Sequence, residues 1–393
     1  MNTSAKTHGL DGTLVQPDWP DLTLDEVRPV LANFRGVAEP SELLTISPRP
    51  FSAASVVATR GGQVFVKRHH RSVCNQAGLQ EEHRFMAHLC AHGARVPRVF
   101  ETENGNTAVE IGEWAYEVHD VPPGEDLYGD ALSWTPFRST AHAYSAGHAL
   151  AKLHIASSGY NAPPRAGRPL VAGFSIFAAP DAATQFDHYV SLRPALREYL
   201  ATRSCHEEAL ALLEPFHAEL VPMLPSLIPL WTHNDLHASN LLWANASETA
   251  QATAVIDFGL ADRTNAVHDL AHAIERNIVE WLSLVDASVN SSQVPVHFDH
   301  LRALLDGYES VRVLSDEEAA SLAPMTALCH AEFALSETDY FLSVLHSDQK
   351  ARMACEGYLV AHAEWFRGPG VSLLDELRLW SETRKQRRRL ATR

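Results

Sequence analysis

Two short polar segments in the second half of the chain restrict its possible folds more than any other feature. His233, Asp235 and Asn240 follow one another in the spacing H-x-D-x-x-x-x-N. Seventeen residues after Asn240 comes Asp257–Gly259, with the sequence D-F-G, directly behind a short apolar run. Either pattern alone recurs by chance in long chains as polar groups of turns or loops. Both together, in this order and beside apolar strands, indicate that the fold builds one site from them.

The residue types in these segments match the needs of phosphoryl transfer, which depends on positioning and charge neutralisation. A carboxylate must orient the acceptor hydroxyl, and Asp235 is the candidate for this base. A carboxylate and an amide oxygen must hold Mg²⁺ against the nucleotide phosphates, and Asp257 and Asn240 supply these groups. The pattern therefore predicts a catalytic Asp235 and a magnesium site at Asn240 and Asp257.

The chain changes character at Pro122–Gly124, where a Pro-Pro-Gly sequence separates a strand-rich part from a helical part. Short apolar runs, two of them joined by a turn at Gly61 and Gly62, predict a small sheet with a hairpin. A helix over 77–92 is followed by Gly93, a typical C-terminal stop. The expected strands cover 42–47, 55–59, 64–68, 96–102, 107–111 and 115–118, and a first helix covers 23–33.

The rest of the chain is predicted to be mainly helical, with one hairpin of strands at 241–243 and 252–256. Ser315 and Glu318 fit a capping box at the start of one helix. The expected helices cover 137–157, 183–201, 205–220, 269–285, 297–312, 316–346, 349–366 and 373–389.

This layout predicts three parts. Residues 1–20 form a loose arm, 21–119 a nucleotide-binding part, and 120–393 a helical part that holds the catalytic segment 231–260. Ligand sites commonly lie in clefts between such parts.

The strand-rich part carries the candidates for binding the nucleotide. Lys67 ends a short apolar strand, from which its ammonium can reach the α- and β-phosphates if a glutamate positions it. Glu82 in the next helix is the preferred partner. Its neighbour Glu81, about 100° away around that helix, is the alternative.

Two further segments of this part suggest nucleotide contacts. The loop over 49–55 has small residues that let the backbone approach phosphates, and the hydroxyls of Ser52 and Ser55 can donate hydrogen bonds to them. The backbone of Glu117 and His119, at the entry to the Pro-Gly joint, is predicted to bond to an adenine edge. The sequence contains no G-x-G-x-x-G and no P-loop, which disfavours a dinucleotide fold and a P-loop enzyme.

Composition excludes several classes of function. Acidic residues outnumber basic ones by 48 to 32, for a formal net charge of −16, which disfavours a general nucleic-acid binder. No run of about 18 apolar residues and no signal peptide is present, which predicts no membrane span. Sparse cysteines without a C-x-x-C pair predict reduced thiols and a cytoplasmic protein. They are Cys74, Cys90, Cys205, Cys329 and Cys355.

The sequence resembles the aminoglycoside phosphotransferase and homoserine kinase-like family, which shares the protein-kinase-like fold. The resemblance implies an α+β protein with two lobes, a small antiparallel-sheet N-lobe and a larger, mainly helical C-lobe. The matching pieces are Val66-Lys67, Glu82 with Gly93, Val96-Pro97, Gly147–His154, His233–Asn240, Ile256–Gly259 and His268–Ala271.

The resemblance also implies an ATP-dependent kinase that phosphorylates a hydroxyl of a small molecule. Lys67 would contact phosphates, and His154, His233 and Asp269 would be mainly architectural. The glycine-poor nucleotide loop departs from protein kinases but is usual in this family. No A-P-E segment follows the D-F-G, which argues against protein substrates. Amino alcohols, sugars and aminoglycosides all remain possible acceptors, and the oligomeric state is left open.

A cluster near the end of the chain offers a weaker candidate. Glu332, Ser336 and Asp339 share one face of a predicted helix by their i, i+4 and i+3 spacing. They are expected to form an exposed polar face, and the alternative is that they bind the acceptor.

Two other functions remain as alternatives. A nucleotide-binding regulator without turnover would keep the same residues. A metal-dependent hydrolase would use His233, Asp235 and His237 as H-x-D-x-H ligands. The hydrolase leaves Lys67 and Asn240 without roles, so the kinase is the preferred hypothesis.

Overall fold

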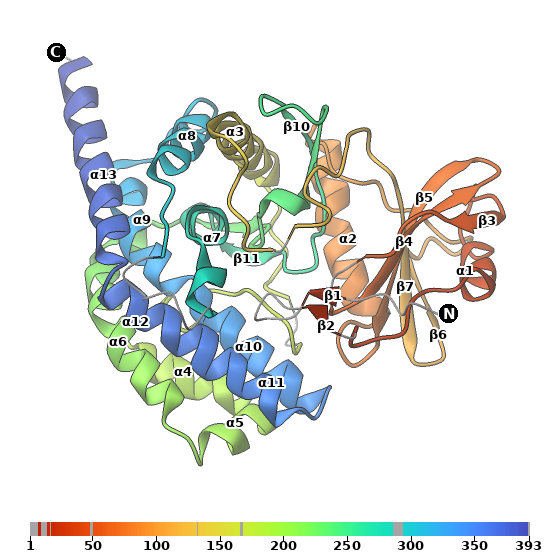
Figure 1. Cartoon of the computed structure of the whole chain (residues 1–393), viewed down its shortest axis with the longest axis horizontal. Coiled ribbons are helices and arrows are strands. Elements are labelled where there is room, and N and C mark those ends of the chain that lie inside the picture. Colours follow the sequence, from red (N-terminus) through yellow and green to blue (C-terminus); the bar gives the residue numbers. More distant parts are fainter. Residues whose placement is uncertain are drawn as a thin grey trace. The chain divides into compact units, whose positions relative to one another are not determined.

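A computed structural model describes residues 7–8, 14–15, 17–47, 50–131, 133–165, 168–285 and 294–391. The chain divides into two compact units (Figure 1). Unit 1 comprises residues 1–132 and 239–259, and unit 2 comprises 133–238 and 260–393. This division differs from the predicted boundary at residue 120, because the segment 239–259 belongs with the N-terminal unit. Most of the predicted arm over 1–20 lies outside the described residues.

Unit 1 contains a five-stranded antiparallel sheet in the order β3-β4-β5-β7-β6. The β4–β5 hairpin closes where Thr59 pairs with Gly62, as the Gly-Gly turn predicts. The α+β character and the small sheet are thereby confirmed. The strands are β3 (Pro40–Leu43), β4 (Ala53–Thr59), β5 (Gly62–His70), β6 (Ala108–Ile111) and β7 (Trp114–Asp120).

The two faces of this sheet differ because side chains alternate along each strand. On one face, Val64 and Val66 of β5 pack with α1 (Leu24–Leu31) in the apolar core. The opposite face carries Lys67, the next residue of β5, and the carboxylate of Glu82 in α2 (Gln76–Ala91) raises the pKa of this lysine. Helix α2 contacts β6 and β7. The polar functional groups of unit 1 therefore gather on the α2 face.

Two further strand pairs belong to the described part of unit 1. β9 (Leu241–Trp243) and β10 (Ala252–Val255) are antiparallel, which confirms the predicted hairpin. The backbone of Val255 donates to the carbonyl of Arg95 at 3.0 Å, and Glu125 exchanges two backbone hydrogen bonds with Trp243. A short pair, β1 (Thr7–His8) and β2 (Leu14–Val15), also belongs to this unit.

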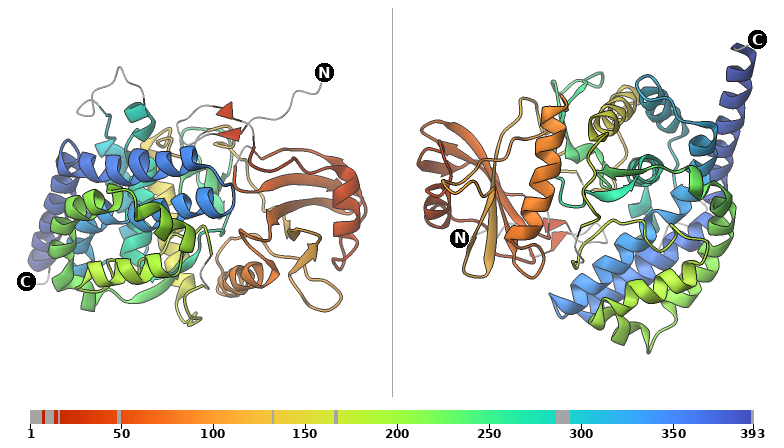
Figure 2. Two further views of the ribbon diagram at one scale, coloured as in Figure 1. Left: turned by 90° about the horizontal axis from the view of Figure 1, so that it is seen from below. Right: turned by 180° about the vertical axis from the view of Figure 1, so that it is seen from behind.

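Unit 2 is mainly helical (Figure 2). Among its described residues, β8 (Pro229–Thr232) and β11 (Asp262–Asn265) form an antiparallel strand pair that the sequence analysis missed. The capping box of Ser315 and Glu318 is confirmed. The α-helices are α3 (Thr140–Ser157), α4 (Ala182–Ser191), α5 (Pro194–Leu200), α6 (Cys205–Leu220), α7 (Ala266–Ile278), α8 (Phe298–Glu309), α9 (Asp316–Leu328), α10 (His330–Ser343), α11 (Asp348–Arg352), α12 (Ala361–Arg367) and α13 (Val371–Ala391). Shorter turns are η1 (Val221–Ser226), η2 (Ala238–Asn240, at the junction of the two units), η3 (Trp281–Val285) and the π-helix η5 (Met353–Val360).

Helix α7 forms the centre of unit 2, and every one of its residues is buried. It packs against α8 and α9, and α9 packs in turn against α6 and α13. Within the described part of the chain, no helix is both long and apolar enough to cross a membrane.

Several predicted helices are interrupted. The helix expected over 183–201 breaks at Leu192 and Arg193, because Pro194 disfavours helical backbone in the residue before it. The helix expected over 349–366 contains the π-helical stretch η5. The strand expected over 96–102 forms only isolated bridges, at Val99 and Thr102.

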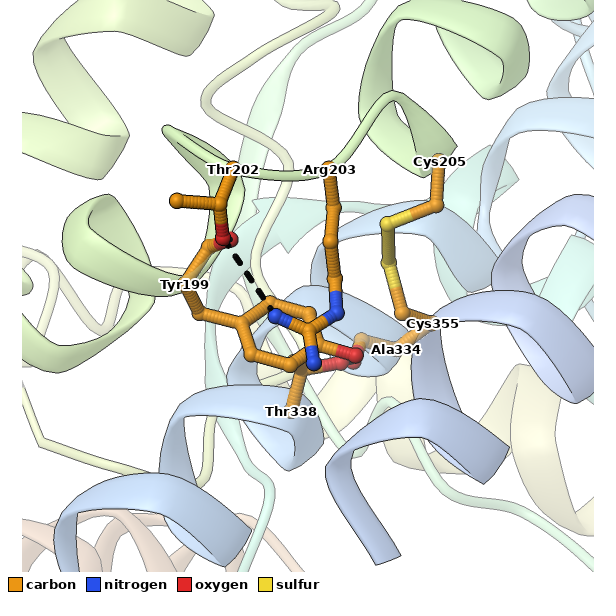
Figure 3. Close-up of a disulfide and its surroundings, with 7 residues drawn as sticks. All are labelled: Tyr199, Thr202, Arg203, Cys205, Ala334, Thr338 and Cys355. Carbon is orange, nitrogen blue, oxygen red and sulfur yellow. Dashed lines mark hydrogen bonds between the residues drawn. A yellow bond between two sulfur atoms is a disulfide. The ribbon is translucent and has the colours of Figure 1, made fainter. Parts of the chain in front are cut away.

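The prediction of five reduced thiols is wrong for one pair. Cys205 at the start of α6 and Cys355 in η5 form a disulfide, with their Cα atoms 6.4 Å apart (Figure 3). Arg203 lies beside the bridge, its guanidinium 3.9 Å from the ring centroid of Tyr199. The two cysteines are 150 residues apart, so only the packing of unit 2 brings them together.

Candidate functional site

The D-F-G segment places Asp257 directly against Lys67. Lys67 Nζ donates a 2.8 Å hydrogen bond to Asp257 Oδ1, and the amide of Gly259 donates to the same oxygen at 3.3 Å. Asp257 has a φ of 59°, in the left-handed region that few non-glycine residues adopt. Its side chain is 37% exposed, whereas that of Lys67 is 11% exposed. The turn therefore leaves part of the Asp257 carboxylate accessible to a ligand.

The hairpin β9–β10 brings Asn240 beside this turn. The carbonyl of Asn240 accepts a 2.9 Å hydrogen bond from the amide of Ile256, the residue before Asp257. Phe258 packs edge-on against Phe85 of α2, with ring centroids 6.0 Å apart, and holds the turn in unit 1. Unit 1 thus brings together three predicted site residues: Lys67, Asn240 and Asp257.

Lys67 lies among three carboxylates. Burial lowers the pKa of Lys67, but the carboxylates of Asp257, Glu117 and Glu82 raise it more, so the pKa ends above its usual value. The predicted partner Glu82 is buried and acts on Lys67 electrostatically, while the direct hydrogen bond goes to Asp257. The Lys67 ammonium is therefore charged across the whole physiological pH range.

The predicted adenine contact at Glu117 and His119 does not fit the structure. The Val118 carbonyl and the Asp120 amide bond to Phe100 and Arg98, respectively. Alternate residues of a strand direct their backbone groups to opposite neighbouring strands. The backbone groups of Glu117 and His119 therefore face β5, where these residues are in register with Lys67 and Phe65. Their backbones are part of the sheet ladder and do not form an exposed edge.

The Glu117 side chain is instead the centre of a buried histidine cluster. Its carboxylate lies within hydrogen-bond distance of the Nε2 atoms of His69, His83 and His119, at 2.9, 2.7 and 2.9 Å. Burial alone would raise the pKa of Glu117, but the three histidines lower it well below the usual value. The sequence analysis did not predict this cluster, although the alternation of side chains along β5 and β7 places His69, Glu117 and His119 on the same face of the sheet as Lys67.

The predicted phosphate loop is only partly described, because Arg49 lies outside the described residues. Ser52 is buried just before β4. Ser55 lies inside β4, is 1% exposed and donates a hydrogen bond to the carbonyl of Val56 at 3.0 Å. A phosphate contact through the Ser55 hydroxyl does not fit this position, because the strand begins earlier than predicted.

Asp235 belongs to unit 2, in the turn after β8. Its Oδ2 lies 3.6 Å from His237 Nε2, and its Oδ1 lies 3.6 Å from Arg276 Nε on α7. Burial raises the pKa of Asp235, but His237, Arg276 and His233 lower it more, and the net pKa is below the usual value. Asp235 is therefore an ionised carboxylate at neutral pH, as an acceptor of a hydroxyl proton must be.

The turn that carries Asp235 is held by Asp269. The amides of His233 and Asn234 donate to its two carboxylate oxygens at 2.9 and 2.7 Å. His154 Nε2 lies 2.9 Å from Asp269 Oδ2, and its Nδ1 bonds to the hydroxyl of Tyr308 at 2.7 Å. This buried network fits the architectural roles implied for His154, His233 and Asp269.

Helix α7 also presents a buried polar face that the sequence analysis missed. His268, His272, Glu275 and Arg276 recur at helical spacing on it, and all are nearly inaccessible to solvent. Within the described residues, both Glu275 carboxylate oxygens and Arg276 Nε and Nη2 lack a hydrogen-bond partner of good geometry. Among the described residues, the buried hydroxyl of Tyr358 in η5 also lacks a hydrogen-bond partner of good geometry. The i, i+4, i+7, i+8 recurrence of ionisable residues was the signal that could have revealed this face.

The predictions for the end of the chain need correction. Glu332, Ser336 and Asp339 are buried on α10 and do not form an exposed face. Glu332 accepts hydrogen bonds from the amides of Ser175 and Ile176, and Ser336 bonds to both backbone groups of Val171. Glu332 and Ser336 therefore anchor the segment before α4, which explains their polarity without an acceptor.

Comparison with known proteins assigns the family. The model of the phosphotransferase enzyme family matches residues 50–314, more than half of the chain. The chain belongs to this family. The family resemblance and the prediction of a phosphotransferase are thereby confirmed, and this class also excludes the metal-dependent hydrolase.

Individual proteins of similar sequence or fold agree with this assignment. A homoserine kinase of Afipia carboxidovorans is 25% identical over 316 residues, which cover 80% of this chain and 81% of that protein. A microcompartment-associated aminopropanol kinase has a similar structure, with a TM-score of 0.57, 16% identity and coverage of 90% of this chain and 98% of that chain. Amicoumacin kinase in complex with AMP-PNP, Ca²⁺ and its ligand aligns with a TM-score of 0.54, 14% identity, and 88% and 91% coverage. These structures confirm the protein-kinase-like fold.

Proposed function

We propose that the protein transfers the γ-phosphoryl group of MgATP to a hydroxyl of a small amino alcohol. The observation that carries this proposal is the meeting of Lys67, Asp257 and Asn240 in one unit of a phosphotransferase-family chain. A solved structure of similar fold contains an ATP analogue with a divalent cation, which supports the choice of nucleotide and metal class.

The residues present fit a hard divalent cation. Asp257 offers a partly exposed carboxylate and Asn240 an amide oxygen, and Mg²⁺ prefers such oxygen ligands together with waters and phosphates. The bound ion would neutralise charge on the β- and γ-phosphates. Lys67, charged and mostly buried, would hold the phosphates, with Glu82 and Glu117 supporting its charge. Ser52 remains a proposed phosphate contact.

We assign the role of base to Asp235. It stands five residues before Asn240 in the chain, and its depressed pKa keeps it ready to accept a hydrogen bond from the acceptor hydroxyl. Arg276 and His237 flank the carboxylate and fix its orientation. The proton of the hydroxyl would pass to Asp235 as the oxygen attacks the γ-phosphorus, and the bond from this phosphorus to the β,γ-bridging oxygen would break to release ADP.

The charges around Asp235 favour an acceptor with an ammonium group. Asp235, Glu275 and Glu337 all interact with Arg276. Burial raises the pKa of Glu275 although Arg276 Nε lies 3.6 Å from its Oε2, so a further cation such as an ammonium would favour the ionised form of this carboxylate. Relatives of similar sequence or fold are named homoserine kinase and aminopropanol kinase, and both names denote hydroxylated amines.

An ADP-release assay with matched acceptors tests this function. We expect 1-amino-2-propanol or homoserine to be phosphorylated, and 1,2-propanediol, which has a hydroxyl in place of the amine, to react about 10²-fold more slowly or worse in kcat/KM. Asp235→Asn should lower kcat by about 10²–10³-fold, or roughly 3–4 kcal/mol. Asp306→Asn, on the exposed side of α8, is the matched control and should retain full activity.

Each contrary result has a distinct meaning. Full turnover by Asp235→Asn would remove Asp235 as the base. Equal kcat/KM values for the amine and the diol would contradict the proposal that the acceptor is an amino alcohol. Tight MgATP binding by calorimetry without phosphorylation of any acceptor in a panel of amines, sugars and aminoglycosides would instead support the nucleotide-binding regulator.

A further inference from the structure

Three histidines on the α2 face of unit 1, gathered around Glu117, have no role in the proposed phosphoryl transfer. Nε2 atoms of three histidines, from β5, α2 and β7, converge on the two oxygens of Glu117. The exposed fractions are 8% for His69, 2% for His83, 1% for Glu117 and 7% for His119. Four ionisable groups from three separate elements thus lie together at a site that is almost inaccessible to solvent.

We propose that this cluster is a binding site for a transition-metal dication of the zinc type. The ligating atoms of His83, Glu117 and His119 all lie within 4.8 Å of one another, whereas His69 lies outside this group and bonds to the other oxygen of Glu117. Two imidazole nitrogens and one carboxylate oxygen, with a water as the fourth ligand, form a donor set that suits zinc and similar first-row metals. Mg²⁺ prefers oxygen ligands, so this site is chemically distinct from the one at Asn240 and Asp257.

The surroundings of His83 support the metal site. Its Nδ1 lies 2.9 Å from the hydroxyl of Thr107, which fixes the ring so that Nε2 faces Glu117. Metal-binding histidines typically bond through their other nitrogen in this way, and loss of such a partner usually weakens metal binding by about 10–100-fold. The rings of His83 and His119 stand nearly perpendicular, at 82°, so their Nε2 atoms approach a common point from different directions.

The local charge balance also favours a dication. Asp257 is assigned to the proposed magnesium site, so Glu117 and Glu82 are the buried carboxylates that Lys67 alone must balance. A cation bound to Glu117 together with neutral imidazoles would supply the missing positive charge. The present N···O distances of 2.7–2.9 Å would widen by roughly half an ångström to fit bonds of 2.0–2.1 Å to zinc, a shift that small side-chain rotations provide.

Zinc titration of the chelator-treated full-length protein tests the proposal. The titration is done in excess Mg²⁺, with a chromophoric chelator as competitor and elemental analysis after desalting. We expect about one equivalent of zinc per chain. Thr107→Val should weaken binding by about 10–100-fold, and His83→Gln and His119→Gln should weaken it more.

Two control variants separate this site from the other possible metal sites. Asp257→Asn removes the proposed magnesium ligand, and His297→Gln removes a ligand from a second histidine–aspartate group on the described residues, formed by His297, Asp299 and His300. Both variants should still bind one equivalent of zinc in this titration. Loss of zinc in His297→Gln, with His83→Gln unaffected, would overturn the proposal.

A measurement on the unaltered protein covers the case in which a histidine variant fails to fold. A ligand that binds only the folded state raises the unfolding midpoint, so stoichiometric zinc should raise it and EDTA should reverse the rise. Cobalt substitution should give the intense visible absorption of a four-coordinate site. Less than a tenth of an equivalent of zinc, with no change in the midpoint, would show a purely hydrogen-bonded cluster and refute the metal site.

Discussion

At the residue scale, the positive charge of Lys67 contributes both to the stability of the fold and to the proposed phosphoryl transfer. It is the counter-charge for the carboxylates of Asp257, Glu117 and Glu82, and Glu117 and Glu82 are themselves buried. Removing one partner of a buried ion pair leaves an uncompensated charge and typically costs 3–5 kcal/mol. A variant that only deletes the charge would therefore confuse loss of fold with loss of activity.

We predict that Lys67→Met lowers both the free energy of unfolding and the rate of phosphoryl transfer, whereas Lys67→Arg restores much of the stability but little of the rate. The guanidinium keeps the charge, but its planar fork cannot reproduce the compact ammonium between Asp257 and the phosphates. Rates about 10²-fold below the unaltered enzyme are expected for both. Steady-state kinetics with denaturant unfolding measure this, and Lys152→Met, on the exposed side of α3, is the control. Wild-type kinetics in Lys67→Arg would contradict the assigned role.

At the element scale, the buried histidines of α7 and α10 make stability depend on pH. Burial lowers the pKa of His268 and of His330 to about 4, so both are neutral in the folded protein. In the unfolded chain a histidine takes up its proton near pH 6.5. Between about pH 6.5 and 4 the unfolded state thus binds more protons, and stability must fall as the pH is lowered through this window.

We predict that each of these two histidines contributes up to about 1.4 kcal/mol per pH unit to this loss. Denaturant unfolding at a series of pH values between 7 and 4.5 measures the slope. His330→Gln should make the slope shallower by about that amount, because one titrating group is removed. A slope identical to that of the unaltered protein would show that His330 does not titrate on unfolding.

The crossing of α3 and α8 depends on two glycines. A Cβ at Gly147 would overlap the carbonyl oxygen of Leu304, and one at Gly307 would overlap the carbonyl oxygen of Tyr144. We predict that Gly147→Ala lowers the free energy of unfolding by about 3 kcal/mol or more, because backbone must move to admit the methyl group. Gly357→Ala in η5 meets no atom within 4 Å and should be tolerated. Thermal unfolding of both variants checks this, and equal midpoints would contradict it.

These elements also show which structural features local sequence patterns can predict and which they miss. The hairpins at Thr59–Gly62 and at β9–β10 were predicted because turn residues and apolar runs are local signals. The buried face of α7 was missed because hydrophobic periodicity treats histidine, glutamate and arginine as solvent-facing, whereas here tertiary packing covers them. Glu332 was misplaced on an exposed face for the same reason.

At the scale of the whole chain, the order of motifs along the sequence predicted that Lys67, Asn240 and Asp257 come together, but not how the chain divides into units. The hairpin after Asn240 and the D-F-G turn belong to unit 1, although both lie in the predicted helical part. The direct partner of Lys67 is Asp257, 190 residues away, and not the nearby Glu82. Contacts of such sequence separation arise from packing, for which a single sequence gives no local signal.

The disulfide is the clearest case of such a contact, and it gives the last prediction. Cys205 and Cys355 close a loop of 150 residues within unit 2, tying the start of α6 to the π-helix that carries Tyr358. Closing a long loop restricts the unfolded chain, and such bridges typically contribute 2–4 kcal/mol. Cys205→Ser should therefore lower the unfolding midpoint clearly, and Cys90→Ser, which removes a free thiol, should not. Thiol titration of the denatured protein should give three thiols before reduction and five after it, because Cys74, Cys90 and Cys329 are not part of the bridge. Five thiols before reduction, with equal midpoints for both variants, would show that the bridge does not form.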